Sequence, residues 1–518
     1  MRVFWLTFLV QIALCYCQYR YGPDRLWRIT NPNDLKSKEL WFHDGQRTLY
    51  DKLATPPNQY VAKNIIFFLG DGMSVPTVTA SRIYEGQLRG IIGERNRLSF
   101  EKFNYVGLSK TYCADRQVPD SACTATAYLS GIKANYVTVG VSADVEVNQC
   151  AAAKLPENRV SSIASWALRA RKSAGLVTTT RVTHASPAGL YAHSANRDFE
   201  SDADIAADTT VTNPADCSDI AKQLIEGDIG KRLRVVLGGG TSKFLPTTSV
   251  DENGNPGERA DGRNLINEWT SGKPGISRYV YNRTGLLGTN LRRTDYLLGL
   301  FAPSHMPYSL DNPVNTPTLS EMTEAAIGVL SKDPNGFFLF VEGGRIDHAH
   351  HDTKAAKALD ETVHFSNAVR RALELTNPWE TLIVVSADHA HTMTISGYPL
   401  INNPITGLNS ELSDVDGLPY AVLSYANGPH PELFYPSTGR IPPVLDGKDA
   451  LYPHPVPMTE ETHEGSDVAV YANGPWAHLF TGVYEQSALP HLMGYAACIG
   501  PGITFCDLQP KSRYNPLI

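Results

Sequence analysis

Short apolar runs recur along the chain, each bounded by glycine, aspartate or other polar residues. They are rich in Val, Ile and Phe and span residues 65–69, 175–178, 234–237, 337–341 and 382–385. Runs of this kind are typical of strands buried on both faces of a parallel sheet. The pattern therefore predicts an α/β fold, with a central, mostly parallel sheet flanked by helices on both faces. Residues 467–471 predict one further strand.

Carboxylates, histidines and a serine follow four of these predicted strands. In chain order they are Asp71, His184, Ser186, Glu342, Asp388 and His389. In an open α/β sheet, ligands bind outside the carboxyl ends of the strands. We therefore expect these side chains to meet at one edge of the sheet. Such a collection, drawn from distant parts of the sequence, indicates a metal site.

One long segment interrupts the pattern of strands. Residues 395–460 are rich in Pro, Gly, Asn and Ser and contain few long apolar runs, which favours loops. We expect a small, loop-rich insertion there. The main α/β domain then has two parts, residues 18–394 and 461–506, followed by a tail at 507–518.

The N-terminal residues have the features of a secretory signal peptide. Met1 and Arg2 precede an apolar run with small residues up to Cys17, and this run is too short for a membrane span. Removal of residues 1–17 would leave six of the eight cysteines, an even number suited to disulfides in an oxidising compartment. The tail lacks the hydrophobic stretch of a lipid-anchor signal. The sequence as written predicts a soluble, secreted protein with no stable membrane anchor.

Composition narrows the possible partners. The chain has 518 residues, of which 42% are hydrophobic, and a net charge of −7, so disorder, collagen and coiled coil are excluded as its main content. The acidic balance argues against binding of nucleic acid through its phosphate backbone. Asn282-Arg283-Thr284 is an N-glycosylation sequon, and secretion favours its use over a chance match.

The histidine-rich segment after residue 341 is the strongest chemical signal. Asp347 and His351 offer mixed oxygen and nitrogen ligands, which suit Zn²⁺ better than Ca²⁺. Asp388 and His389 repeat this combination. A single Asp after a strand is more often a helix cap. Three histidines within four residues beyond a buried strand shift the interpretation toward metal ligands.

A second chemical candidate is the stretch that begins at Asp120 and Ser121. It can continue as a helix, so either residue is first of all an N-cap. A serine at a helix N-terminus also places a bound phosphoryl group against free backbone N–H groups. No Gly-x-Ser-x-Gly elbow surrounds Ser121, so its activation would have to come from a metal. Arg197, taken alone, is most simply a surface charge.

Six segments, covering nearly the whole mature chain, carry a resemblance to a known family. They are residues 64–73, 119–128, 178–187, 341–348, 387–389 and 461–463. Together they resemble the alkaline phosphatases, most closely the secreted or membrane-anchored animal members. The resemblance implies hydrolysis of phosphate monoesters, a homodimer, and a crown domain at the 395–460 insertion.

The resemblance also implies roles for individual residues. Ser121 would be the nucleophile, and Asp120 and Arg197 would bind the substrate phosphate. One zinc would be held by Asp347, His351 and His463. A second zinc, bridged to Ser121, would be held by Asp71, Asp388 and His389. A magnesium would be held by Asp71, Ser186 and Glu342, with His184 nearby. Three more histidines are expected around these ligands, namely His348, His350 and His391.

These residue types suit phosphoryl transfer. Two zinc ions about 4 Å apart can stabilise the attacking and leaving oxygens of an in-line displacement. One of them would lower the pKa of the Ser121 hydroxyl for attack on phosphorus, which would give a covalent phosphoserine. The guanidinium of Arg197 can bind two non-bridging phosphate oxygens. Such a site contacts mainly the phosphoryl group, which predicts broad specificity for phosphate monoesters.

The six remaining cysteines fall into pairs. Two pairs match positions that form disulfides in animal members, Cys150 with Cys217 and Cys498 with Cys506. Cys113 and Cys123 are left over on either side of the nucleophile, and we predict a third bridge between them. The alternative is two buried free thiols.

The chain departs from animal alkaline phosphatases at their additional calcium site. That site is built partly from a Phe-Glu pair and a later Asp-Pro, whereas the matching segments here read Phe301-Ala302-Pro303 and Thr316-Pro317. Calcium takes about 6–8 oxygen ligands, and Glu252 alone would not suffice. We therefore expect two Zn²⁺ and one Mg²⁺ per chain and no calcium.

Two other functions compete with this interpretation. A sulfatase or phosphodiesterase could share the fold, but the sulfatase pattern of Cys or Ser followed by x-Pro-x-Arg is missing at Ser121. A binding protein without catalysis would usually have lost a ligand, and every matched ligand is present. Turnover of a phosphate monoester at alkaline pH, compared with a diester and a sulfate ester, separates these functions.

Overall fold

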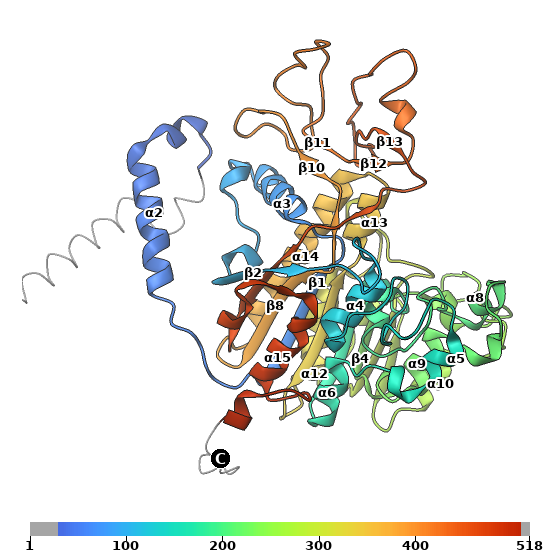
Figure 1. Cartoon of the computed structure of the whole chain (residues 1–518). Coiled ribbons are helices and arrows are strands. Elements are labelled where there is room, and N and C mark those ends of the chain that lie inside the picture. The colour runs from blue at the N-terminus through green and yellow to red at the C-terminus, as the bar shows by residue number, and fades with distance from the viewer. Residues whose placement is uncertain (1–28, 509–518) are drawn as a thin grey trace, which may run out of the picture.

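A ten-stranded sheet forms the centre of the computed structural model, which describes residues 29–508. The strands are β1 (Asn64–Gly70), β2 (Tyr105–Lys110), β3 (Ser173–Arg181), β4 (Val235–Gly239), β5 (Ser277–Val280), β6 (Tyr296–Leu300), β7 (Phe337–Gly343), β8 (Thr381–Ala387), β15 (Val468–Asn473) and β16 (Gly482–Glu485). Their order is β16-β2-β15-β8-β1-β7-β3-β4-β6-β5 (Figure 1). Within this sheet only β15 runs antiparallel to its neighbours, β2 and β8.

The central strands account for the apolar runs in the sequence. β1 pairs in parallel with β7 on one side and β8 on the other. Phe67 and Leu69 of β1 belong to one hydrophobic cluster, whereas Ile66 and Phe68 belong to another. Successive side chains of a strand point to opposite faces, so burial of both sets means that both faces of the sheet are covered. The predicted α/β fold is confirmed.

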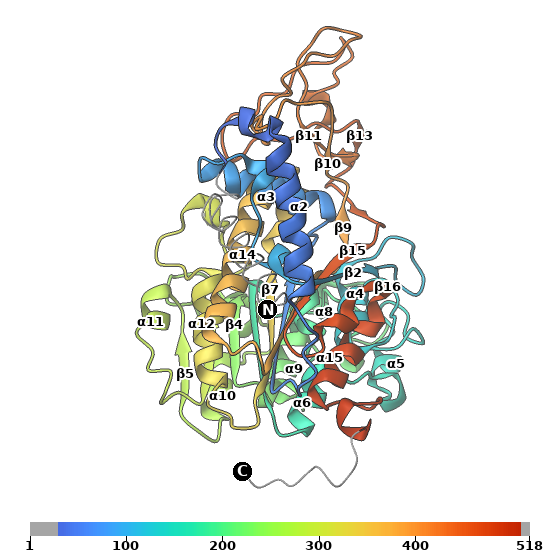
Figure 2. The ribbon, with the colours of Figure 1, turned by 90° about the vertical axis from the view of Figure 1, so that its left-hand side faces the viewer.

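Helices surround the sheet, and some of them cover its two faces. They are α2 (Lys38–Leu53), α3 (Val75–Leu88), α4 (Ser121–Ser130), α5 (Cys150–Lys154), α6 (Ile163–Arg169), α7 (Ala185–Ala188), α8 (Asp202–Ala207), α9 (Ile220–Glu226), α10 (Leu265–Ser271), α11 (Arg283–Leu287), α12 (Leu319–Leu330), α13 (Arg345–His351), α14 (Ala355–Leu375) and α15 (Leu489–Ala497). One hydrophobic cluster contains residues of α12 and α14, and the other contains residues of α4, α6 and α15. Figure 2 shows α12 and α14 on one side of the sheet and α6 and α15 on the other.

The 395–460 segment extends beyond the carboxyl ends of the central strands (Figure 1). Its regular structure consists mainly of short strands: β10 (Thr394–Ile395) with β11 (Leu423–Ser424), and β12 (Asn427–Gly428) with β13 (Val456–Pro457). A further pair, β9 (Ala390–His391) and β14 (His463–Glu464), lies where the chain leaves and re-enters the main domain. The segment is loop-rich, as its composition predicts.

The predicted signal peptide and residues 509–518 of the predicted tail lie outside the described residues. Among residues 29–508, no helix combines the length and the apolar character needed to cross a bilayer. Helix α2 lies beside the body of the molecule (Figure 1) and exposes Phe42, Tyr50 and Leu53 by 65%, 62% and 78%. Exposed apolar side chains of this kind are available for burial against another molecule.

Candidate metal and catalytic site

The predicted site residues lie at the carboxyl ends of four neighbouring strands. Asp71 follows β1, Glu342 is near the end of β7, Asp388 follows β8, and His184 follows β3. β1 lies between β7 and β8, and β7 pairs with β3. Parallel pairing therefore brings side chains that are far apart in the sequence to one edge of the sheet.

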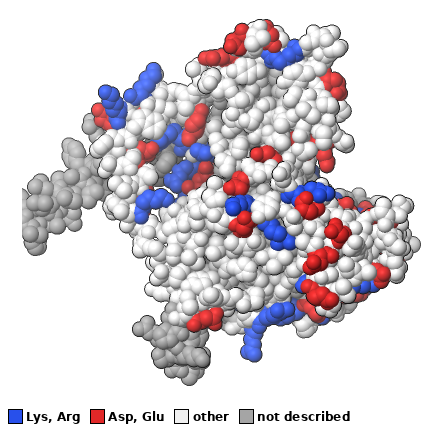
Figure 3. Space-filling model, in the orientation of Figure 1, with Lys and Arg blue, Asp and Glu red and all other residues white. Residues whose placement is uncertain are grey.

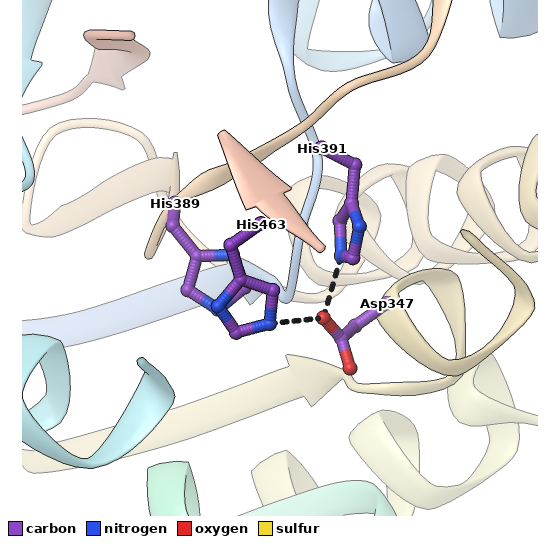
Figure 4. A group of neighbouring side chains, drawn as sticks. All are labelled: Asp347, His389, His391 and His463. Atoms are coloured by element: carbon purple, nitrogen blue, oxygen red, sulfur yellow. Dashed lines mark hydrogen bonds and ion pairs between the residues drawn. The ribbon is translucent and has the colours of Figure 1, made fainter. Parts of the chain in front are cut away.

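Helix α13 begins two residues after β7 and carries the histidine-rich segment. Asp347 and His351 are four residues apart, so they lie on the same face of this helix. His463 approaches from β14, which pairs with β9 through His391. In Figure 4, His391 and His463 both point their rings at the carboxylate of Asp347, while the ring of His389 stacks on that of His463.

The ligand atoms expected for one zinc converge on a common point. His351 Nε2 lies 3.4 Å from Asp347 Oδ2, and His463 Nε2 lies 3.3 Å from Asp347 Oδ1. The two imidazole nitrogens are 3.1 Å apart. This set of one carboxylate and two imidazoles suits Zn²⁺.

The second expected zinc set surrounds Ser121. Ser121 Oγ lies 3.1 Å from His389 Nε2 and 3.4 Å from Asp71 Oδ1. His389 Nε2 is also 3.1 Å from Asp388 Oδ2. The Gly72 and His389 backbone N–H groups donate to Asp388 Oδ1 at 2.9 and 2.8 Å, which fixes the orientation of that carboxylate.

Oxygen donors dominate the expected magnesium set. Ser186 Oγ lies 3.5 Å from Asp71 Oδ2, and ligand atoms of Asp71, His184 and Glu342 lie within 4.8 Å of one another. Thr178 and Thr180 donate hydrogen bonds to Glu342 Oε2 and hold its side chain in place. Hard oxygen ligands of this kind suit Mg²⁺.

The site concentrates negative charge in the interior of the protein. Asp71, Glu342 and Asp388 are fully buried. Burial, with repulsion from Asp388, holds the pKa of Asp71 well above its ordinary value, and burial raises the pKa of Glu342 to about 7. Glu342 Oε1 has no hydrogen-bond partner among the described residues, and Asp388 Oδ2 has only its ion-pair contact with His389. Buried, mutually repelling carboxylates with unused oxygens are stabilised by cations, so the donor set fits the metals.

Asp120 and Arg197 lie at the N-terminus of α4. Asp120 caps the helix by accepting hydrogen bonds from the Ala122 and Cys123 backbone N–H groups. Arg197 Nη1 donates to Asp120 Oδ2 at 2.9 Å, and Arg197 Nη2 lies 3.1 Å from His184 Nε2. Arg197 is therefore held over the site by Asp120 rather than exposed as a surface charge.

The three other predicted histidines have different partners. His391 lies between Asp347 and Glu461. Burial alone would lower the pKa of His391, but attraction to these two carboxylates outweighs it and raises the pKa to about 10. His350 bridges the Thr77 hydroxyl and the Tyr425 hydroxyl, whereas His348 Nδ1 lies 2.7 Å from Arg345 Nη1.

Sequence reasoning missed several supporting residues. Thr178 and Thr180 were not distinguished from other β-branched residues of a strand, although alternate residues at a strand end share a face. Glu461 stands two residues before His463, but nothing in that segment indicates its contact with His391. His305, whose ring lies 4.2 Å from that of His348, was also missed because it comes from an unrelated loop.

Within residues 29–508 three disulfides are present, in the pairing expected from the sequence: Cys113–Cys123, Cys150–Cys217 and Cys498–Cys506. Phe301 and Ala302 lie in the segment that matches the calcium site of animal members, and both side chains are buried. The Ala302 carbonyl accepts hydrogen bonds from the Gly240 and Thr241 backbone N–H groups. Glu252 Oε2 accepts a hydrogen bond from the Tyr279 hydroxyl at 3.3 Å.

Comparison with known proteins identifies the family. The family model described as alkaline phosphatase matches residues 62–499. The chain belongs to the alkaline phosphatase family. It is similar to the tissue-nonspecific isozyme of alkaline phosphatase from Gallus gallus, with 47% identity over 98% of this chain and 96% of the relative. It is also similar to the membrane-bound alkaline phosphatase of Bombyx mori, with 49% identity over 86% of this chain and 82% of the relative.

Solved alkaline phosphatases share the fold. The Thermus thermophilus enzyme aligns with a TM-score of 0.61 at 22% identity, over 85% of this chain and 92% of that one. A His-to-Asp variant of the TAB5 alkaline phosphatase, described with Mg bound in its M3 site, aligns with a TM-score of 0.59 at 22% identity, over 86% of this chain and 100% of that one. At this identity the comparison supports the α/β architecture alone.

Proposed function

We propose that this protein hydrolyses phosphate monoesters to an alcohol and inorganic phosphate through a phosphoserine at Ser121. The observation that carries the proposal is the position of Ser121 Oγ, at the N-terminus of α4 and within 3.1–3.4 Å of His389 Nε2 and Asp71 Oδ1. Asp120 provides the cap of this helix, so the Ser121 hydroxyl is not needed for capping and can face the surrounding donor set.

The proposed metal complement is two zinc ions and one magnesium ion. The zinc ligands would be Asp347, His351 and His463 for one ion, and Asp71, Asp388 and His389 for the other; the magnesium ligands would be Asp71, Ser186 and Glu342, with His184 nearby. When bound, these cations stabilise negative charge on the attacking and leaving oxygens. Calcium is proposed to be absent, and elemental analysis after dialysis in low calcium tests this, because stoichiometric calcium would contradict it.

The chain's own residues then carry two displacements. Ser121 Oγ loses its proton and forms a bond to phosphorus, while the bond from phosphorus to the ester oxygen breaks and the leaving alcohol takes up a proton. Water next forms a bond to phosphorus, the bond to Ser121 Oγ breaks, and the serine recovers a proton. The helix N-terminus favours the negative charge of the bound phosphoryl group.

Arg197 positions the phosphoryl group in both steps. Its guanidinium can donate two hydrogen bonds to non-bridging oxygens, and its ion pair with Asp120 restricts its orientation. These groups contact the phosphoryl group rather than the alcohol. This supports broad specificity for monoesters.

The decisive experiment replaces the nucleophile. Ser121→Ala should lower kcat for 4-nitrophenyl phosphate at alkaline pH by several orders of magnitude with zinc content unchanged. Ser130→Ala, on the same helix and with a buried hydroxyl that has no hydrogen-bond partner within the described part of the chain, is the matched control. Near-parental turnover by Ser121→Ala would refute the covalent mechanism. Faster turnover of a diester or a sulfate ester than of the monoester would favour the rival activities.

We also propose a secreted, glycosylated homodimer. Three disulfides support an oxidising compartment. Asn282 accepts the Gly285 N–H at 2.8 Å through its carbonyl oxygen, which leaves its amide nitrogen for glycan attachment. Apolar side chains are exposed on α2, and Tyr398 and Val415 are 86% and 92% exposed in the 395–460 segment. Their exposure supports contact with a second copy of the chain, and we propose the 395–460 segment as a crown domain. Light scattering and enzymatic deglycosylation test these two proposals.

A further inference from the structure

A second charged cavity lies at the opposite edge of the sheet from the candidate site. It has a volume of about 610 Å³ and is bordered by the amino ends of β3, β4 and β6. In Figure 1 this edge is the lower one, near α6, whereas α13 lies toward the upper one. β3 spans nine residues, and a strand rises about 3.3 Å per residue, so roughly 25–30 Å separates the two edges.

The charged lining of this cavity is strongly unbalanced. Five cationic side chains face one carboxylate, that of Asp333; they are Arg171, Lys172, Lys231, Arg232 and Arg234. The whole chain, by contrast, carries a net charge of −7. On the face shown in Figure 3, positive and negative side chains are intermingled. A cavity with this excess of one sign focuses the electrostatic field and attracts anions.

Two of the five cations are held by neutral groups. Lys172 Nζ donates to the Lys63 and Asn335 carbonyls at 2.9 and 2.7 Å, and Arg232 Nη2 donates to the Leu168 carbonyl at 2.8 Å. These hydrogen bonds position the cations without cancelling their charge.

Carboxylates offer little compensation. Asp333 Oδ2 accepts from the Ser173 hydroxyl at 2.5 Å and lies 3.8 Å from Arg234 Nη2. Lys231 pairs with Asp228, which is 97% exposed, and such exposed pairs contribute little. The guanidinium of Arg171 has no ion-pair partner within residues 29–508. Burial also lowers the pKa of Lys172, which is the response expected when a charge lacks a full counter-charge.

We propose that this cavity binds a compact ligand that bears several sulfate or phosphate groups. Its cations come from two separate segments, the α6–β3 turn and the residues just before β4, so they can contact different anionic groups of one ligand. The lining also contains three apolar side chains, Leu168, Pro274 and Tyr296, which a sugar or similar ring can contact. The volume suits a ligand of one or two rings.

The test uses sucrose octasulfate, which carries clustered anionic groups and offers no phosphate ester for hydrolysis. Binding to the full chain is measured by isothermal titration calorimetry at about 0.15 M salt, with saturating inorganic phosphate to occupy the catalytic site. Arg171→Gln/Lys231→Gln should weaken binding by about tenfold or more, because two exposed cations are lost. Lys38→Gln/Arg370→Gln removes the same charge from exposed positions on α2 and α14 and should bind as the parent does.

Three further measurements complete the test. Thermal midpoints show whether both variants fold, and turnover of 4-nitrophenyl phosphate should be unchanged in both because the cavity lies far from Ser121. Inositol hexakisphosphate in place of sucrose octasulfate shows whether phosphate groups serve as well as sulfate groups. Absence of binding, or equal weakening in both double variants, would overturn the proposal.

Discussion

The Cys113–Cys123 disulfide connects the nucleophile helix to a proposed zinc ligand. It closes the segment that leads into Ser121, and within that segment the Pro119 carbonyl accepts a hydrogen bond from His463 Nδ1 at 2.8 Å. That hydrogen bond sets the imidazole tautomer, with Nε2 directed at Asp347. Loss of the bridge should therefore have two effects, on stability and on zinc retention.

Both effects can be estimated. The bridge joins residues 10 apart in the sequence, and the loss of chain entropy in the unfolded state predicts about 2.7 kcal/mol of stabilisation at 25 °C. A backbone partner of a metal-binding histidine contributes about 10–100-fold in metal affinity. Cys113→Ala/Cys123→Ala should therefore lower the free energy of unfolding by about 2.7 kcal/mol and release zinc at least about tenfold faster to a chelator.

The Cys498–Cys506 bridge provides a matched control. It spans a separation of 8 residues, for which the same estimate is about 2.5 kcal/mol, and it joins the C-cap of α15 to Cys506, neither of which is a predicted ligand. Cys498→Ala/Cys506→Ala should thus lose nearly the same stability and keep the parental rate of zinc release. Denaturant unfolding and a colorimetric zinc chelator measure the two quantities. Equal zinc release by both variants would refute the role assigned to Pro119.

Three further substitutions test other parts of the structure. Burial raises the pKa of Glu361 to about 7, above its ordinary 4.5, so ionisation of this carboxyl destabilises the fold as pH rises from about 4.5 to 7. Glu361→Gln should therefore raise the free energy of unfolding by about 3 kcal/mol at pH 8.5 and hardly at pH 4.5. Parallel pH profiles of the thermal midpoint for the parent and the variant would contradict this. Gly72 has φ +67° and a Cβ there would lie 2.6 Å from His391 Nε2, so Gly72→Ala should lower zinc content, measured by elemental analysis. Arg197→Ala should raise KM for a monoester at least about tenfold with zinc content unchanged; an effect on kcat alone would count against phosphate binding.

The sequence was most informative where strands are buried on both faces. The runs at 65–69, 337–341 and 382–385 correspond to β1, β7 and β8. Continuous apolar segments of this length in an α/β protein are typical of buried strands. The edge of the sheet was less readable. β2 alternates exposed and buried residues and β16 is largely exposed, so neither contains an apolar run, and no local pattern shows that β15 is antiparallel.

The candidate site likewise contains residues that local sequence patterns predict and contacts that they do not. Asp347 and His351 could be paired from their spacing on one helix, and Asp388 and His389 from their place after a strand. The contacts of Glu461 with His391 and of Pro119 with His463 join segments 70 and 344 residues apart. Such contacts depend on how loops close over the sheet, and single-sequence patterns do not encode that closure.

The separation of the ligands along the chain has a consequence for biosynthesis. Asp71 and His463 belong to one site, so the proposed metal cages are incomplete until more than 390 residues after Asp71 have been synthesised and β14 has paired with β9. Contacts of such long sequence separation form late, because loop closure must precede them. Loading of the proposed metals would then follow synthesis, and the nascent protein would have to keep four carboxylates close together before any cation neutralises them.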